Sequence, residues 1–163
     1  MNLEEIIKYF RIKRLVRKGL RIGKNVYIGE EVSIDSCYCW LISIGNDCML
    51  GDGTIILAHD ASTKIHLNHM RIGKVTIGNR TFIGANSIIL PNVRIGNDVI
   101  IGAGSVVTHD ISSGFVAVGN PAREIKPTIE YIECNETNLK ARLMSKKNKQ
   151  EILELIGKDI GYV

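Results

Sequence analysis

Four histidines and four cysteines are the residues in this sequence best suited to proton transfer, nucleophilic attack or metal binding. The pKa of imidazole lies close to neutral pH, so a neutral histidine can remove a proton from a hydroxyl group that attacks an electrophile. Among the cysteines, Cys37 and Cys39 form a C-x-C pair, but no second pair has the spacing of a zinc site. We therefore predict no metal site and interpret the cysteines as reduced thiols that fill small apolar spaces. The histidines are His59, His66, His69 and His109.

Composition and charge argue against several other classes of function. The net charge of +4 permits an anionic ligand but does not require nucleic acid, so we expect no nucleic-acid partner. The sequence has no Gly-x-x-x-x-Gly-Lys-Ser/Thr phosphate loop and no Gly-x-Ser-x-Gly elbow, which argues against nucleotide hydrolysis and serine-hydrolase chemistry. It has no apolar run of about 18 residues and no N-terminal apolar core of signal-peptide length, so a cytoplasmic protein is expected.

A six-residue repeat determines the elements that must position these side chains. An aliphatic residue followed by glycine recurs every six residues, and a smaller residue stands four places after each aliphatic one, as in IGNRTFIGANSI at residues 77–88. One short strand and its turn fit in six residues, and three such strands can close a triangular coil with the aliphatic side chains on its axis. A single coil buries too little surface, but stacked coils, about 4.8 Å apart, share a continuous core.

Counting three hexapeptides to a coil gives four coils. They cover Ile22–Cys39, Ile44–Ala61 and, as two uninterrupted coils, Ile77–Ser112. The repeat loses its phase twice, once after Cys39 and once across residues 62–76. We expect a protruding loop at 62–76, and loops that leave a rigid scaffold often carry function.

The repeat and two further stretches carry a family resemblance. The first is IILAHDASTKIH, which contains His59, and the second is IGAGSVVTHDISSGFVAVGNPAREIKP. Over residues 22–126 the chain resembles the hexapeptide-repeat acyltransferases, above all the maltose and galactoside O-acetyltransferases and the sugar O-acetyltransferases of surface-polysaccharide biosynthesis. The resemblance implies an all-β fold, a left-handed parallel β-helix, which is an exception to the right-handed crossover rule. It also implies a homotrimer with active sites between subunits.

The resemblance further implies acetyl transfer from acetyl-CoA, as cosubstrate, to a hydroxyl of a sugar or of a surface-polysaccharide precursor. In the family, a histidine at the position of His59 is the general base. Asp35, one coil earlier, is the nearest candidate to orient the base or bind the acceptor, whereas Asp60 is expected to cap a turn. His66, in the loop, is a second candidate for acceptor binding, with a solvated loop residue as the alternative.

The coenzyme contacts also come from the resemblance. Small residues permit a close approach of the pantetheine arm to the backbone, and basic side chains suit its phosphates. The positions that match the family's contacts are Ala85, Ala103, Thr108, His109, Arg123 and Lys126.

Both ends of the chain lie outside the repeat. Residues 1–21 predict a basic helical cap that covers the open edge of the first coil, with a peripheral membrane contact as the alternative. Residues 127–163 predict a tail that is partly helical.

Two other functions stay open from the sequence alone. An N-acetyltransferase acting on an amino-sugar nucleotide shares the same fold and chemistry. A γ-carbonic-anhydrase-like metal protein, from another class, needs a closely spaced pair of histidines on one coil and a third at least one coil away, an arrangement that the four histidines lack on the repeat. The acceptor itself cannot be read from the sequence.

Overall fold

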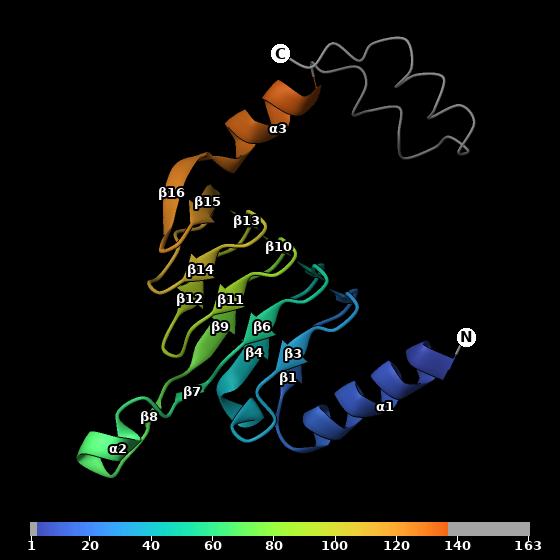
Figure 1. The fold of residues 1–163 in the computed structure, drawn as a ribbon. Helices are drawn as coiled ribbons and strands as arrows, with labels where there is room; N and C mark the ends of the chain where they lie inside the picture. The colour runs from blue at the N-terminus through green and yellow to red at the C-terminus, as the bar shows by residue number, and fades with distance from the viewer. Residues whose placement is uncertain (1–2, 137–163) are drawn as a thin grey trace. The chain divides into compact units, whose positions relative to one another are not determined.

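The computed structural model describes residues 3–136, and its strands stack as successive turns of a parallel coil (Figure 1). Sheet 1 contains β1 (Arg21–Ile22), β4 (Ile42–Ile44), β9 (Val75–Ile77) and β12 (Arg94–Ile95). Sheet 2 contains β2 (Tyr27–Ile28), β5 (Met49–Leu50), β10 (Phe82–Ile83), β13 (Ile100–Ile101), β15 (Phe115–Gly119) and the antiparallel β16 (Ala122–Pro127). Sheet 3 contains β3 (Ser33–Ile34), β6 (Ile55–Ile56), β11 (Ile88–Ile89) and β14 (Val106–Val107).

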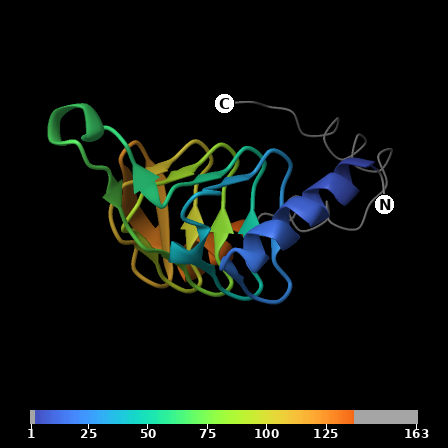
Figure 2. The same ribbon diagram turned by 90° about the horizontal axis from the view of Figure 1, so that it is seen from below.

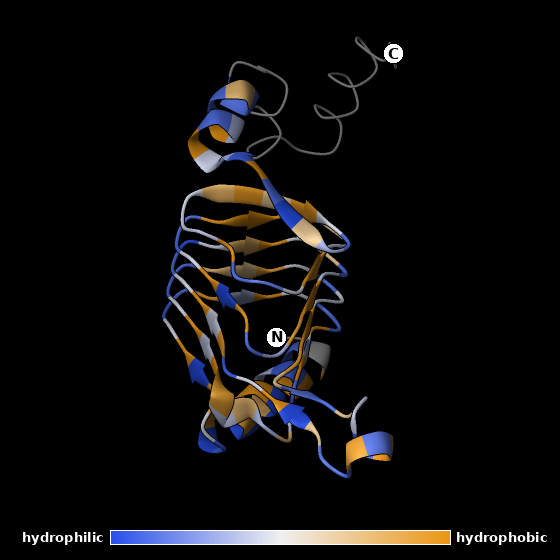
Figure 3. Cartoon of the chain, turned by 90° about the vertical axis from the view of Figure 1, so that its left-hand side faces the viewer, coloured by the Kyte–Doolittle hydropathy of each residue, from blue (hydrophilic) through white to orange (hydrophobic). Residues whose placement is uncertain are grey.

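The pairing register confirms the predicted coils. The aliphatic residue of each hexapeptide pairs with the aliphatic residue of the next coil, as Ile83 does with Leu50 and Ile101. These side chains fill the axis, and the orange hydrophobic segments recur from coil to coil in Figure 3. The smaller residues four places later are buried beside them. The residues of this second class with at most 2% exposure are Val32, Cys48, Thr54, Thr81, Ser87, Val93, Val99 and Ser105.

Glycine and asparagine make the coil corners possible. A Cβ atom on Gly45 would lie 2.7 Å from the carbonyl oxygen of Gly78 in the next coil, so only glycine fits there. At the same corner, the backbone N–H of Asn46 donates to the side chain of Asn79, and that of Asn79 donates to Asn97, each at 2.8 Å. These bonds between asparagines of successive coils give partners to backbone N–H groups that would otherwise lack them where the chain bends.

Ile83→Ala should destabilise the fold strongly. Ile83 is fully buried at the centre of sheet 2, and removing a buried isoleucine to alanine costs about 2–5 kcal/mol. The midpoint of urea denaturation measures the loss. Ile125→Ala, at a position 54% exposed, is the matched control and should change the stability by no more than about 0.5 kcal/mol. Equal effects of the two substitutions would contradict the placement of Ile83 on the coil axis.

The two phase slips are the places where the chain leaves the coil. The first contains the short 3-10 helix η1 (Cys39–Leu41). The second forms an arm, residues 59–74, which includes α2 (Lys64–Leu67) and an antiparallel pair of β7 (His59–Asp60) with β8 (Arg71–Ile72). Figure 2 shows the arm projecting from the side of the stack. The arm begins three residues before the predicted loop at 62–76 and ends two residues before its end, because β7 begins at His59 and β9 begins at Val75.

Helix α1 (Leu3–Arg17) covers the edge of the first coil. Its basic side chains donate hydrogen bonds to backbone carbonyls of that coil: Lys8 to Ile28 at 2.9 Å and Arg11 to Val32 at 2.7 Å. Leu15 inserts from the helix into the core. These contacts favour the cap over the membrane alternative for this face of the helix, because the bonds satisfy an open strand edge.

The chain divides into two units, residues 1–128 and 129–163. Helix α3 (Thr128–Glu136) begins at the end of the first unit, and residues 129–136 are the described part of the second. The remainder of the predicted C-terminal tail lies outside the described residues. None of the helices among residues 3–136 is long and apolar enough to cross a membrane.

Candidate active site

His59 and Asp35 meet at the corner where sheet 3 ends. Asp35 follows β3 in the first coil, and His59 lies three residues after β6 in the second coil. The backbone N–H of Asp35 donates to the carbonyl of Ile56 at 2.9 Å, which keeps the two coils in register at this corner. The imidazole Nδ1 of His59 then forms a hydrogen bond with the carboxylate Oδ2 of Asp35.

Asp35 is a buried carboxylate whose two oxygens are both fully used. Oδ1 accepts hydrogen bonds from the backbone N–H groups of Cys37 at 2.9 Å and Tyr38 at 3.0 Å. Oδ2 accepts the N–H of Ala58 at 3.1 Å besides the imidazole. The side chain of Asp35 is only 1% exposed, and burial acts to raise its pKa. The hydrogen bonds from His59 and the three backbone groups outweigh burial, so the pKa lies below its ordinary value of 3.8.

This arrangement selects one tautomer of His59. Because ionised Asp35 can only accept hydrogen bonds, Nδ1 must carry the proton and Nε2 the lone pair. The side chain of His59 is 31% exposed, so it is accessible to a substrate while Asp35 is not. A buried carboxylate that orients an accessible imidazole in this way is the arrangement by which a histidine acts as a general base.

The lowered pKa of Asp35 predicts a pH-dependent contribution to stability. With the folded pKa below 3.8, ionised Asp35 stabilises the fold fully above that ordinary value, and the contribution disappears as pH falls through the folded pKa. The stability difference between the wild type and Asp35→Asn should therefore be largest near neutral pH and shrink as pH falls below 3.8. Urea denaturation over a series of pH values from neutral into that acidic range measures it, and a pH-independent difference would contradict this role of Asp35. The Ile83→Ala difference should stay constant with pH.

One aromatic side chain, Tyr38, adjoins the imidazole, and a second, Trp40, adjoins Tyr38. The ring centroid of Tyr38 lies 5.3 Å from that of His59 and 5.3 Å from that of Trp40. Sequence reasoning missed both aromatic residues. They lie in the SCYCWL segment directly after Asp35, where the repeat is interrupted, and that interruption was the available signal.

The structure separates the other candidates near His59. Asp60 accepts the backbone N–H of Ser62 at 2.8 Å, which is the turn cap expected for it. His66 is exposed on α2, and among residues 3–136 no hydrogen bond or ring contact joins it to His59. Of the cysteines predicted as apolar fillers, Cys39 and Cys48 are buried, but Cys37 and Cys134 are exposed, so the prediction was wrong for these two.

Four of the predicted coenzyme positions fall on the two margins of sheet 3. The first margin is the corner where the chain enters its strands, and the second margin is the corner where it leaves them. Ala85 and Ala103 stack at the corner where sheet 3 begins. Thr108 and His109 lie at the opposite margin, on the corner of His59 but two coils further on, about 10 Å at the parallel-strand spacing. The Thr108 hydroxyl and His109 Nδ1 are 2.7 Å apart.

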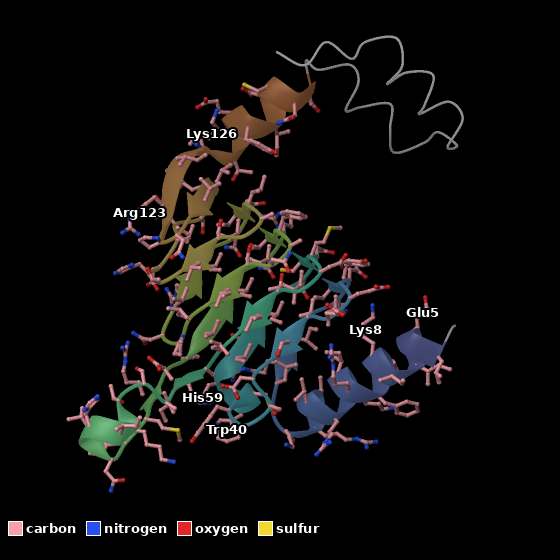
Figure 4. The ribbon with its side chains drawn as sticks, in the orientation of Figure 1. Glu5, Lys8, Trp40, His59, Arg123 and Lys126 are labelled. Atoms are coloured by element: carbon pink, nitrogen blue, oxygen red, sulfur yellow. The ribbon has the colours of Figure 1, made fainter. Side chains whose placement is uncertain are left out.

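The β15–β16 hairpin carries the two basic candidates above the first margin. Arg123 pairs with Val118, whose side chain covers Gly102, and Lys126 pairs with Val116 (Figure 4). The backbone N–H of Gly119, the residue after Val118, donates to the Ser105 hydroxyl at 3.1 Å. The hairpin thus holds Arg123 close to the corner of Ala103.

A surface hollow of about 520 Å³ lies beside the second margin. Its lining carries two basic side chains, Lys74 and Arg94, against one acidic side chain, Asp110, and this net positive charge suits an anionic ligand. The lining residues are Lys74, Thr76, Asn92, Val93, Arg94, Thr108, His109 and Asp110. Among residues 3–136, no group of three or more histidine, cysteine or acidic side chains is arranged to hold a metal ion.

Two known proteins are similar to this chain in sequence. The putative acetyltransferase YvoF of Bacillus subtilis is 38% identical over 106 residues, 65% of this chain and 59% of its own length. Protein CapG of Staphylococcus aureus is 38% identical over 130 residues, 76% of this chain and 73% of its own. The chain therefore spans less than two thirds of YvoF and nearly three quarters of CapG.

Solved structures have the same fold. The polySia-specific acetyltransferase NeuO is 33% identical, with 66% of this chain and 51% of that chain covered and a TM-score of 0.57. A galactoside acetyltransferase in complex with coenzyme A is 26% identical, with 82% and 76% covered and a TM-score of 0.57. These neighbours imply that the parallel β-helix is left-handed, as predicted.

Family models match both halves of the coil. The bacterial transferase hexapeptide model (six repeats) matches residues 74–109, and the model for the hexapeptide repeat of succinyl-transferase matches residues 19–58. These matches, and the 38% identity over 73% of the length of CapG, establish the family of the chain. The chain belongs to the hexapeptide-repeat acetyltransferases.

Proposed function

We propose that this protein is an acetyl-CoA-dependent O-acetyltransferase that acts on a hydroxyl of a sugar or surface-polysaccharide precursor, with His59 as the general base. The observation that carries the proposal is the buried, fully hydrogen-bonded Asp35 that orients an accessible His59 imidazole. The acetyltransferase relatives support the reaction class, and the coenzyme A complex of one neighbour supports the donor.

The proposed reaction needs no covalent enzyme intermediate. His59 Nε2 removes the hydroxyl proton as the acceptor oxygen attacks the thioester carbonyl, and the Asp35 carboxylate stabilises the imidazolium that forms. The coenzyme leaves as a thiol. Holding both substrates in line contributes to the rate beyond the proton transfer.

The two separated groups of coenzyme positions favour a site shared between subunits. Ala85 and Ala103 lie on one margin of sheet 3, and Thr108 and His109 on the other. In a homotrimer, the first margin of one subunit can face the second margin of its neighbour, so that one coenzyme contacts both. The basic hollow beside His109 and the Arg123 hairpin then supply positive charge for the coenzyme phosphates.

Arg123→Ala should weaken coenzyme binding without slowing the chemical step. Arg123 is exposed beyond the coil, and losing one charge-assisted contact to a phosphate should raise the KM for acetyl-CoA about tenfold at unchanged kcat. Steady-state kinetics with varied acetyl-CoA measures it. Arg21→Ala, an exposed arginine on β1 at the other end of the stack, is the control. An unchanged KM in Arg123→Ala would remove this residue from the coenzyme site.

The proposed activity is tested by thiol release from acetyl-CoA with a panel of sugars and isolated glycans. Mass spectrometry of the products should show one added acetyl group, and mild base, which hydrolyses esters but leaves amides intact, should remove it. Acetylation confined to amino groups would instead favour the N-acetyltransferase. No transfer to any saccharide would contradict the proposed substrate class.

A further inference from the structure

We infer that Trp40, supported by Tyr38, forms the platform on which the ring of a carbohydrate acceptor stacks while its hydroxyl faces His59. The inference rests on the proposed function and deepens it, because it names the residues that bind the acceptor and the feature of the acceptor that they recognise. Figure 4 shows Trp40 and His59 at the same corner.

Trp40 exposes a large aromatic surface that the fold itself does not use. It is half exposed, at 50%, although tryptophan is among the side chains with most to gain from burial. Its position is nevertheless fixed: its Cβ would lie 2.8 Å from a Cβ on Gly19, so the turn after α1 closes tightly against the base of the side chain. Gly19 has a φ of +107°, which suits glycine. The backbone therefore holds Trp40 while its ring remains open to solvent.

Tyr38 connects this surface to the proposed base. Its ring lies between the other two, at 5.3 Å from each centroid, tilted by 46° to His59 and 52° to Trp40. Its backbone N–H donates to Asp35, so the same residue that supports the platform also helps to position the carboxylate behind the imidazole. The indole is thus linked to the imidazole through one intervening ring, with 5.3 Å between neighbouring centroids. A monosaccharide or disaccharide that stacks on the indole can therefore reach the imidazole with one of its hydroxyls.

The chemistry of the platform suits a pyranose. The face of an indole is apolar and carries the negative end of the ring quadrupole. One face of a pyranose presents a patch of C–H groups with slightly positive hydrogens, while its hydroxyls point outward around the ring. Stacking therefore binds the ring and leaves a hydroxyl at its edge free to approach Nε2. An open-chain polyol has the same hydroxyls but no such face.

The protein contains one tryptophan, so its fluorescence reports on this site alone. The wild type is titrated with methyl galactopyranoside, methyl glucopyranoside and methyl mannopyranoside, and with galactitol as the ring-free control. At least one pyranoside should change the tryptophan emission in a saturable way, and galactitol should not. No response to any pyranoside, or an equal response to galactitol, would overturn the platform. Because the titration needs no turnover, its result is independent of the proposed activity.

Kinetics of the variants complete the test. Trp40→Ala should raise the KM for the acceptor about tenfold while kcat and the KM for acetyl-CoA stay within about twofold. Trp40→Phe keeps an aromatic face and should restore most of the acceptor affinity. Phe10→Ala, which removes an exposed aromatic from α1, is the matched control.

An unchanged acceptor KM in Trp40→Ala, or a change of oligomeric state in that variant, would overturn the inference and assign Trp40 a structural or interface role. If His59→Ala abolishes transfer but Trp40→Ala leaves the acceptor KM unchanged, the platform is refuted and the proposed activity stands.

Discussion

His59→Ala is expected to lower kcat for acetyl transfer by about 10²–10⁴-fold, the contribution typical of a general base. The imidazole is the accessible group that Asp35 orients, and alanine leaves nothing to accept the hydroxyl proton. Affinity for acetyl-CoA should stay within about twofold, because the proposed coenzyme positions lie on the β15–β16 hairpin and on later coils than His59. Steady-state assays for kcat and calorimetric titration with coenzyme A measure the two quantities separately.

A matched control for this prediction is His69→Ala. His69 is an exposed histidine of the arm whose backbone carbonyl accepts a hydrogen bond from Thr63 at 2.8 Å, a contact that the substitution retains. Its kcat should equal that of the wild type. A His59→Ala enzyme with more than about a tenth of wild-type kcat would show that the proton is taken by another group or by water.

The second large effect is expected for Asp35→Asn, which should lower kcat by about 10²–10⁴-fold. An amide nitrogen in the position of Oδ2 faces the N–H of Ala58 and can only donate to His59 Nδ1. The imidazole proton then moves to Nε2, and the tautomer is the wrong one for a base. The opposite orientation of the amide places its nitrogen against the N–H groups of Cys37 and Tyr38. Either orientation leaves an unpaired donor, so stability should also fall by about 1–3 kcal/mol.

Asp98→Asn controls for loss of a hydrogen-bonded carboxylate elsewhere. Asp98 pairs with Arg80 at 2.7 Å on an exposed corner of a later coil than that of His59. The kcat of the Asp98→Asn enzyme should therefore equal that of the wild type. The kinetic loss in Asp35→Asn should persist at temperatures at which the variant is fully folded, which separates tautomer control from instability. Full activity in folded Asp35→Asn would contradict the role given to this carboxylate.

The coil could be predicted from the sequence because its rule is local and repeated. Each Ile-Gly unit combines an aliphatic side chain that fills the axis with a glycine at a position where a Cβ atom would collide with the next coil, as at Gly45. Position along the repeat then fixes the strand partners, so the pairing of Ile83 with Ile101 follows from their spacing in the sequence alone.

The arm and the aromatic cluster could not be predicted in the same way. Both begin where the repeat loses its phase, and there the sequence no longer specifies which side chains meet. Asp35 was placed one coil before His59 by the repeat, but its three backbone donors come from the irregular segment at Cys37 and Tyr38 and from Ala58. Tyr38 meets the imidazole, and Trp40 meets Tyr38, only through the tertiary path of that segment.

The most direct test of the central claim is a crystal structure of the protein with bound coenzyme A, read as the distance from the coenzyme sulfur to Nε2 of His59. A reacting hydroxyl must fit between them with contacts of about 3–3.5 Å, so the account predicts a separation of about 6 Å or less. A sulfur bound more than about 10 Å from this nitrogen, with the same coenzyme site occupied in every subunit, would contradict His59 as the base.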